Sequence, residues 1–408
     1  MTTPRLEGLT SVAQAHVYKA GVLAAMLTRS PGGVEFGYRS EYLAAGGQAV
    51  ATTLPLTEQP VVTVAGAVPA FFAGLLPEGR RLSSLRRAVK TSADDELSLL
   101  LAVGSDTIGD VQVVPAGQEP TPAEPLVKAE REWSEVRFVD VLAEAGVVDP
   151  VALPGVQDKV SARMISVPIA RAGERFVLKL DPPESPHVVE NEAFFLDLAR
   201  EARMSSARAR LVHDADGLAG LLVTRFDRVS QPDGSNVALA CEDACQVLGR
   251  WPADKYLVTC EQVVEALADR CAAKPVALRA LFQQLCFALL TGNGDVHAKN
   301  LSILATADGE WRVSPAYDLP STLPYGDTKL ALSMLGRTSG ISRRHLLGFA
   351  AEIGLSERAA IKVLDGLLDR LADLDDRLRG GALPFPQKVT ADLVAGLRYR
   401  RRLAEPAI

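Results

Sequence analysis

The chain has 408 residues, of which 48% are hydrophobic, 23% charged and 5% aromatic. This length has room for two or three domains, and the apolar content can form full cores, which excludes disordered and fibrous classes. The 44 Lys and Arg residues face 50 Asp and Glu residues, giving a formal charge of -6. Such a balance is not expected of a chain whose main task is to coat phosphate backbones.

The cysteines and the distribution of apolar residues indicate the cellular compartment of the protein. All five cysteines lie beyond residue 240 and none forms a C-x-x-C pair, so we expect neither a disulfide framework nor a structural zinc site. No basic segment followed by an apolar run opens the chain, and the longest uncharged stretch, 61–77, is interrupted by Pro69. That stretch is too short to cross a bilayer. We expect a cytoplasmic protein without membrane association.

Proline content divides the chain. Residues 115–125 hold four prolines in eleven positions, which is typical of a linker. We therefore predict an N-terminal subdomain over 1–115 and a Pro-rich linker over 116–133. The elements expected before the linker are strands at 61–64 and 111–114 and a helix at 75–89.

Beyond the linker, the pattern changes from mixed to helical. Short β-rich runs alternate with helical spacing at first, and apolar residues recur at helical spacing beyond residue 240. This predicts two lobes, 134–228 and 229–408. The elements expected in them are strands at 176–180 and 221–224 and helices at 134–145 (with Ser134 as its N-cap), 188–202, 276–290 and 361–378.

The densest group of polar side chains is G-N-G-D-V-H-A-K-N at 292–300, directly after an apolar helix. Asp295 and Asn300 are five residues apart, as are the aspartate and asparagine of a protein-kinase catalytic loop, which orient the acceptor hydroxyl and bind magnesium. A polar loop that caps the next element would show the same spacing. His297 could touch nucleotide or simply hold the loop.

A predicted hairpin follows this loop. Runs 301–304 and 311–313 flank an Asp-Gly turn, which would return Asp318 toward Asn300. Magnesium prefers hard oxygen ligands, one or two of them from protein, so Asn300 and Asp318 are candidate ligands. Asp318 could equally be a turn residue before Pro320.

Lys179 interrupts a short apolar strand, F-V-L-K-L at 176–180. The period of two places Lys179 on the face opposite Phe176 and Leu178, where a solvent-facing lysine is the common explanation. A protein kinase has at this position the lysine that grips the α/β-phosphates and pairs with a helix glutamate. Glu192 lies on the apolar stripe of the following helix, where an acid needs a cation.

Two further segments would complete the order of elements that a kinase-like phosphotransferase has along its chain. The turn at 153–159 could present backbone N–H groups to phosphate, although one glycine also fits an ordinary turn. Residues 222–228 end a strand in charged side chains around Phe226, which suits an adenine hinge or a salt-bridged strand end. The sequence has no Walker A, G-x-G-x-x-G, G-x-S-x-G or H-E-x-x-H motif.

Several motifs together resemble the HipA family, whose members are serine/threonine protein kinases and toxins of HipBA-type type II toxin–antitoxin systems. The stretch F-F-A-G-L-L-P-E-G at 71–79 is similar to the family's N-terminal subdomain, so the resemblance covers nearly the whole chain. It implies an α+β, bilobed, protein-kinase-like fold with an extra N-terminal subdomain and a mainly helical C-terminal lobe. The other motifs are G-V-Q-D-K at 155–159, V-T-R-F-D-R at 223–228, E-D-A-C-Q at 242–246, G-D-V-H-A-K-N at 294–300 and S-P-A-Y-D-L at 314–319.

The resemblance also implies roles for individual residues. Asp295 would be the catalytic aspartate, and Asn300 and Asp318 would hold Mg²⁺. The residues expected to bind ATP are Pro154, Gly155, Val156, Gln157, Asp158, Lys159, Lys179, Thr224, Arg225, Phe226, His297, Ala298, Lys299, Asn300, Tyr317 and Asp318.

Two positions depart from the family pattern. Ala152 stands where the family often has a serine whose autophosphorylation silences the kinase, which puts that self-inactivation in doubt. Thr224 stands where glutamate is frequent, which should alter the contacts with adenine.

By the same resemblance, the protein would phosphorylate an aminoacyl-tRNA synthetase, with the glutamyl enzyme favoured, and halt translation. Its partner would be a small helix-turn-helix, HipB-like antitoxin, and operator DNA would be contacted only through that antitoxin. Two other functions stay open: a kinase of a small molecule, and a pseudokinase that serves as an antitoxin-bound corepressor. The complete set of Asp295, Asn300, Asp318 and Lys179 argues against the pseudokinase.

Overall fold

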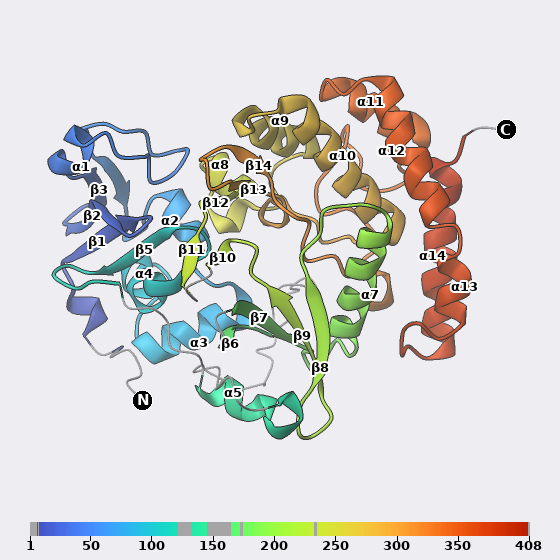
Figure 1. The fold of residues 1–408 in the computed structure, drawn as a ribbon, viewed down its shortest axis with the longest axis horizontal. Helices are drawn as coiled ribbons and strands as arrows, with labels where there is room; N and C mark the ends of the chain where they lie inside the picture. The colour runs from blue at the N-terminus through green and yellow to red at the C-terminus, as the bar shows by residue number, and fades with distance from the viewer. Residues whose placement is uncertain are drawn as a thin grey trace.

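The computed structural model describes Leu6 and residues 8–120, 132–144, 165–171, 174–231 and 235–406. Figure 1 shows three parts along the long axis: an N-terminal sheet with its helices, a central sheet, and a C-terminal group of helices. Buried apolar side chains gather in three clusters that follow this order along the chain. The domain boundaries given above stay predictions.

The N-terminal part contains a five-stranded antiparallel sheet. The predicted strands at 61–64 and 111–114 are confirmed and lie at its two edges. The predicted helix at 75–89 begins only at Gly79, because Pro77 lacks an N–H group and disfavours helical backbone before it. In sheet order the strands are β4 (Val61–Val64), β3 (Gly33–Tyr38), β2 (Val22–Ser30), β1 (Gln14–Lys19) and β5 (Val111–Pro115), and the helices are α1 (Ser40–Ala44), α2 (Ala70–Gly74), α3 (Gly79–Val89) and α4 (Glu96–Val103).

The central part is a four-stranded antiparallel sheet with α7 (Val188–Glu201) packed against it. Burial alternates along the second strand, so Phe176, Leu178 and Leu180 face the core while Lys179 faces the other side. The predicted strands and the predicted helix at 188–202 are confirmed. In sheet order the strands are β6 (Ile165–Arg171), β7 (Glu174–Leu180), β9 (Ala219–Thr224) and β8 (Ala209–His213); β10 (Arg228–Ser230) and β11 (Asn236–Ala238) form a separate hairpin.

The helix predicted to start at Ser134 starts later. Residues Trp133–Glu135 form a 3₁₀ turn, and helix α5 covers Phe138–Glu144. The backbone N–H of Phe138 donates to the carboxylate of Asp214, from the loop after β8, at 2.9 Å. A capping acceptor from a distant loop therefore replaces the local cap at Ser134.

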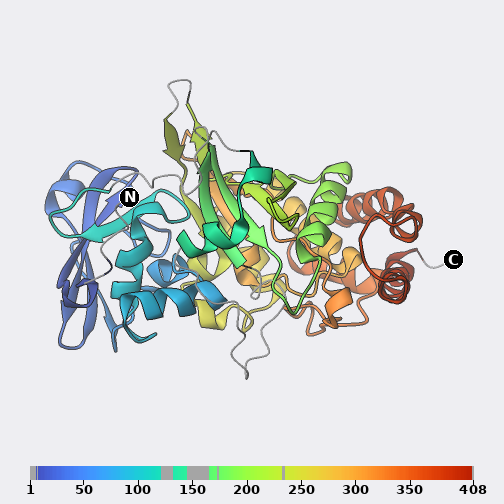
Figure 2. The same cartoon turned by 90° about the horizontal axis from the view of Figure 1, so that it is seen from below.

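The C-terminal part is mainly helical, as predicted. Its long central helix, α10 (Lys274–Thr291), is buried on most sides. Figure 2 shows the outer helices stacked at the end of the molecule away from the N-terminal sheet. The remaining elements are α8 (Ala244–Val247), α9 (Cys260–Arg270), α11 (Arg343–Glu352), α12 (Glu357–Arg370), α13 (Leu374–Arg379), α14 (Gln387–Ala404) and a sheet of β12 (Cys241–Asp243), β13 (Ser302–Ala305) and β14 (Trp311–Val313).

The helix predicted over 361–378 is two helices. α12 ends at Arg370 and α13 begins at Leu374. Leu371 and Leu374 on either side of the turn are both fully buried, so apolar spacing continues across the break and hides it from the sequence.

All five cysteines are buried and free, which confirms that the chain has no disulfide framework. Among the residues that the structure describes, no helix combines the length and apolar content needed to span a membrane.

Buried ion pairs bind the N-terminal part to the central part. The guanidinium of Arg225 lies 2.7 Å from Asp227 and 2.8 Å from Asp106, and that of Arg228 also pairs with both acids. The backbone N–H of Gly109 donates to Asp227 at 2.9 Å. Burial alone would raise the pKa of Asp227, but the two guanidinium groups hold it below its ordinary value.

Replacing Asp227 should therefore destabilise the folded chain. Asp227→Ala leaves two buried guanidinium groups with one shared acid, and we expect a loss of about 3–5 kcal/mol in the free energy of unfolding, measured by urea titration. Asp216→Ala, which removes an exposed partner of Arg137, is the control and should change little. Equal effects of the two substitutions would contradict this account.

Candidate active site

The loop at 292–300 begins where α10 ends. Gly292 caps the helix with φ 67°, a left-handed backbone that favours glycine. Gly294 has no room for a side chain, because a Cβ there would lie 2.4 Å from the carbonyl oxygen of Lys329. Asn293 accepts the N–H of Asp295 through Oδ1 at 3.0 Å. These local constraints fix the position of Asp295, which is 2% exposed.

Lys179 is shared between two acids that come from different parts of the chain. Its Nζ lies 2.7 Å from Oε1 of Glu192 on α7 and 2.7 Å from Oδ1 of Asp318 after the hairpin. The pairing of Lys179 with Glu192 is thus confirmed. Burial alone would lower the pKa of Lys179, but Asp318 and Glu192 raise it above its ordinary value. The lysine is charged and held in place.

The predicted hairpin is confirmed and brings Asp318 to Asn300. Strands β13 and β14 pair as expected, and Nδ2 of Asn300 donates to Oδ2 of Asp318 at 2.6 Å. Asp318 has a left-handed backbone, with φ 59°. Strained backbone of this kind persists only where the surroundings impose it, and it is common at functional sites.

Asn300 and Asp318 fit a magnesium ion. Oδ1 of Asn300 is buried and has no hydrogen-bond partner within the part of the chain that the structure describes. Leaving such an acceptor unsatisfied costs about 1–3 kcal/mol. A hard cation would satisfy it together with the carboxylate of Asp318. The assignment of these two residues as metal ligands stays a prediction.

Tyr256 is a neighbour of Asp295 that the sequence did not reveal. Its hydroxyl donates to Oδ1 of Asp295 at 3.1 Å, and its ring lies edge-on to His297 at 5.1 Å. Tyr256 comes from a loop with no catalytic motif, 39 residues before Asp295, so no local pattern could have indicated it.

A cavity of about 330 Å³ lies where the three parts meet. Lys179, Thr224 and Phe226 line it, as do Lys299 and Tyr317, so the structure gathers these predicted residues around one space. Asp295, His297, Ala298, Asn300 and Asp318 are not among the lining residues, although Lys179 links the cavity to Asp318. The predicted phosphate loop, Pro154, Gly155, Val156, Gln157, Asp158 and Lys159, lies outside the described residues, as does Ala152.

Two of the predicted ATP-binding side chains are engaged elsewhere. The guanidinium of Arg225 is held by Asp106 and Asp227, as described above. Nζ of Lys299 donates to the carbonyl oxygen of Gly74 at 2.9 Å and pairs with Asp243 at 3.2 Å. Both residues line the cavity, but their charged groups make the contacts that hold the N-terminal part in place.

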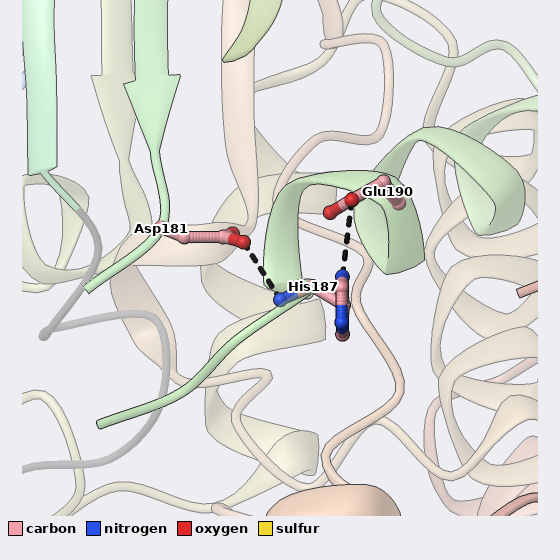
Figure 3. A group of neighbouring side chains, drawn as sticks. All are labelled: Asp181, His187 and Glu190. Atoms are coloured by element: carbon pink, nitrogen blue, oxygen red, sulfur yellow. Dashed lines mark hydrogen bonds and ion pairs between the residues drawn. The ribbon is translucent and has the colours of Figure 1, made fainter. Parts of the chain in front are cut away.

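A second group of side chains, Asp181, His187 and Glu190, lies where α7 begins (Figure 3). Asp181 accepts the backbone N–H groups of His187 at 2.7 Å and Val189 at 2.9 Å, one on each carboxylate oxygen. His187 contacts Glu190 through Nδ1 at 3.1 Å. Because both oxygens of Asp181 are used, this group serves as the N-terminal cap of α7 and so helps to place Glu192.

Two family profiles match the chain. The HipA N-terminal domain matches residues 15–114, and the HipA-like C-terminal domain matches residues 151–374, more than half of the chain. The chain belongs to the HipA family. The resemblance noted in the sequence is therefore confirmed.

Individual relatives of this HipA family chain carry kinase names. Y4mE of Sinorhizobium fredii is 31% identical over 325 residues, which cover 74% of this chain and 77% of Y4mE. The serine/threonine-protein kinase toxin HipA of Shewanella oneidensis is 28% identical over 301 residues and 65% of each chain.

The fold is that of a solved HipA structure. The chain of the Shewanella oneidensis complex of HipA, HipB and operator DNA superposes with a TM-score of 0.75 over 96% of both chains, at 21% identity. The predicted α+β, kinase-like fold is confirmed.

His297 should remain neutral across the physiological range. Burial, reinforced by the charge of Lys255, lowers its pKa to about 3, whereas an unfolded histidine titrates near 6.5, about its ordinary value. Between these values the folded chain binds fewer protons than the unfolded chain, so stability contributed by His297 is lost as pH falls through that window.

NMR of the imidazole nitrogens tests this, with His297→Gln to assign the resonance. We expect no protonation of His297 between pH 5 and 8, and a shallower loss of stability in acid for the variant. An imidazole that titrates near pH 6.5 would disprove the assigned environment.

Proposed function

We propose that this protein is an ATP- and Mg²⁺-dependent serine/threonine protein kinase that acts as the toxin of a type II toxin–antitoxin system. The observation that carries the proposal is the set of contacts around Lys179. One ammonium group joins the helix acid Glu192 to Asp318, and Asp318 in turn accepts from Asn300. A protein kinase needs this arrangement to hold phosphates and metal in register.

The residues divide the work of phosphoryl transfer as follows. Lys179 at the cavity wall would bind the nucleotide phosphates, while Asn300 and Asp318 would hold magnesium, which neutralises charge on the phosphates when bound. Asp295, fixed by Asn293 and Tyr256, would orient the serine hydroxyl. Positioning and electrostatic stabilisation account for most of such catalysis.

Phosphoryl transfer would take place in one step, in which one bond forms as another breaks. The serine oxygen forms a bond to the γ-phosphorus as the bond from that phosphorus to the β,γ-bridging oxygen breaks. ADP leaves with the electron pair, and the hydroxyl proton passes to the carboxylate of Asp295. Burial lowers the pKa of His297, so its imidazole adds no positive charge that would weaken the Asp295 carboxylate as a proton acceptor.

The substrate and partner follow from the family resemblance. We propose an aminoacyl-tRNA synthetase as the substrate, with the glutamyl enzyme favoured, and halted translation as the consequence. The Shewanella oneidensis structure contains HipB and operator DNA together with HipA, which supports a small HipB-like antitoxin as partner here and contact with DNA through it.

Asp295→Asn should remove phosphoryl transfer while nucleotide binding persists. The amide cannot accept the hydroxyl proton, and we expect the rate to fall by about 10²–10⁴-fold. The assay follows labelled phosphate from ATP into proteins of a host lysate and into purified glutamyl-tRNA synthetase, with nucleotide affinity measured in parallel. Asp308→Asn in the exposed hairpin turn is the matched control.

The outcome separates the three candidate functions. A labelled protein band that is present with wild type and lost with Asp295→Asn supports a protein kinase and identifies its target. Label in the low-mass fraction alone would favour a small-molecule kinase. Nucleotide binding without transfer in wild type would favour the pseudokinase. Loss of nucleotide binding in Asp295→Asn would contradict the role assigned to Asp295.

A further inference from the structure

The N-terminal part brings one carboxylate close to the loop at 292–300. Nζ of Lys299, in that loop, donates to the carbonyl oxygen of Gly74 at the end of α2. Glu78 follows as the residue just before α3. Figure 1 shows α2 beside α8, where the N-terminal part meets the C-terminal part. Glu78 therefore lies at the junction of these two parts.

Glu78 is charged and contacts two lysines. Its Oε2 lies 2.6 Å from Nζ of Lys255, and its Oε1 lies 3.8 Å from Nζ of Lys299. Burial alone would raise the pKa of Glu78, but the two ammonium groups hold it below its ordinary value. Lys299 also pairs with Asp243 at 3.2 Å, whereas Glu78 is the only acid that pairs with Lys255 among the described residues. Loss of the Glu78 charge would thus affect chiefly Lys255, whose side chain is 11% exposed.

Lys255 connects Glu78 to Asp295 through the next residue. Nζ of Lys255 lies 5.3 Å from the centroid of the Tyr256 ring, within the range of a cation–π contact. The backbone carbonyl oxygen of Lys255 accepts the N–H of Ala298 at 3.2 Å. The Tyr256 hydroxyl, as described above, donates to Oδ1 of Asp295. Residues 255 and 256 therefore hold the loop at two points, and Glu78 holds the ammonium group beside them.

Tyr256 contacts the carboxylate of Asp295 directly. Asn293 holds the backbone N–H of Asp295, whereas the Tyr256 hydroxyl donates to the side chain. Burial, and next the charge of Asp295, raise the pKa of Tyr256, so the hydroxyl keeps its proton and stays a donor. Because a misplacement of about 1 Å can slow a reaction about 10²-fold, the direction of this carboxylate matters for phosphoryl transfer.

This set of contacts lies apart from the nucleotide cavity. Lys299 lines the cavity, but its contacts with Gly74 and Asp243 do not involve Glu78. A change at Glu78 is therefore expected to affect the acceptor side of the reaction and to leave nucleotide binding as it is. The residues of the set that do not line the cavity are Glu78, Lys255, Tyr256 and Asp295.

We propose that Glu78 is a positioning residue for phosphoryl transfer, which acts on Asp295 through Lys255 and Tyr256. The N-terminal part then takes part in the transfer step in addition to lining the cavity. This inference rests on the proposed kinase function of the same site.

The rate of phosphoryl transfer and the affinity for nucleotide, measured separately, test the proposal. Labelled phosphate from ATP is followed into the protein band that wild type labels in a desalted host lysate, over a range of ATP concentrations. Calorimetry with Mg²⁺ and a non-hydrolysable ATP analogue gives the nucleotide affinity.

Tyr256→Phe removes only the hydroxyl, and we expect the rate at saturating ATP to fall about tenfold or more with KM for ATP within about twofold of wild type. Glu78→Gln keeps the size of the side chain but removes its charge, and we expect the same pattern with a fall of about 5–10-fold. Lys255→Met breaks the same ion pair from the other side and should reproduce the result of Glu78→Gln. Because all three changes act on one carboxylate, the double variant Glu78→Gln/Tyr256→Phe should be about as slow as Tyr256→Phe alone.

Glu184→Gln is the matched control. Glu184 pairs with Arg80 on α3, and its side chain is 32% exposed, against 31% for Glu78. This variant loses an ion pair of similar burial between the N-terminal part and the rest of the chain, but one outside the set of contacts that leads to Asp295. It should transfer phosphate as wild type does. Thermal unfolding checks that each variant is folded.

The inference is wrong if Glu78→Gln and Lys255→Met transfer phosphate as fast as wild type, or if their loss is explained by weaker nucleotide binding. Losses that multiply in the double variant, or an equal loss in Glu184→Gln, would also overturn it, while the kinase proposal stands because wild type is active. Wild type that binds the analogue but transfers no phosphate would overturn the proposed kinase function, and this inference with it.

Discussion

The position of one ammonium group organises the centre of this molecule. Lys179 faces away from the core of its own sheet, and two carboxylates meet it, the buried one of Glu192 from the helix that covers that sheet and that of Asp318 from the segment after the hairpin of the helical part. A buried charge of this kind is stable only while its partners stay in place. The contact therefore ties the central sheet to the helical part and places Asp318 beside Asn300.

A second set of charged side chains ties the N-terminal part to the rest of the molecule. Arg225 joins Asp106 to Asp227, and Lys299 joins the loop at 292–300 to the carbonyl oxygen of Gly74. Side chains that the sequence assigns to nucleotide binding thus hold the three parts around the space that they line. The N-terminal part is consequently a wall of the site, and a partner that shifted it would change the cavity.

Much of the arrangement of the candidate site could be predicted, because short intervals along the sequence match those of protein kinases. The interval between Asp295 and Asn300, the lysine within an apolar strand and the Asp-Gly hairpin each reflect a short stretch of backbone geometry. Pro77 delays the start of α3 locally, but two other boundaries differ from the prediction for reasons that the local pattern does not show. Asp214 caps α5 and moves its start from Ser134 to Phe138, and the buried turn after Arg370 interrupts a leucine pattern that continues unbroken.

The sequence by itself determined the family, the helical and stranded segments and the polar residues of the loop, because these depend on neighbours along the chain. Apart from the pairing of Lys179 with Glu192, only the tertiary structure decided which distant polar groups meet. Tyr256 reaches Asp295, and Lys299 reaches Gly74, across separations that no sequence pattern encodes. Glu78 meets Lys255 in the same way, since 177 residues separate the two along the chain.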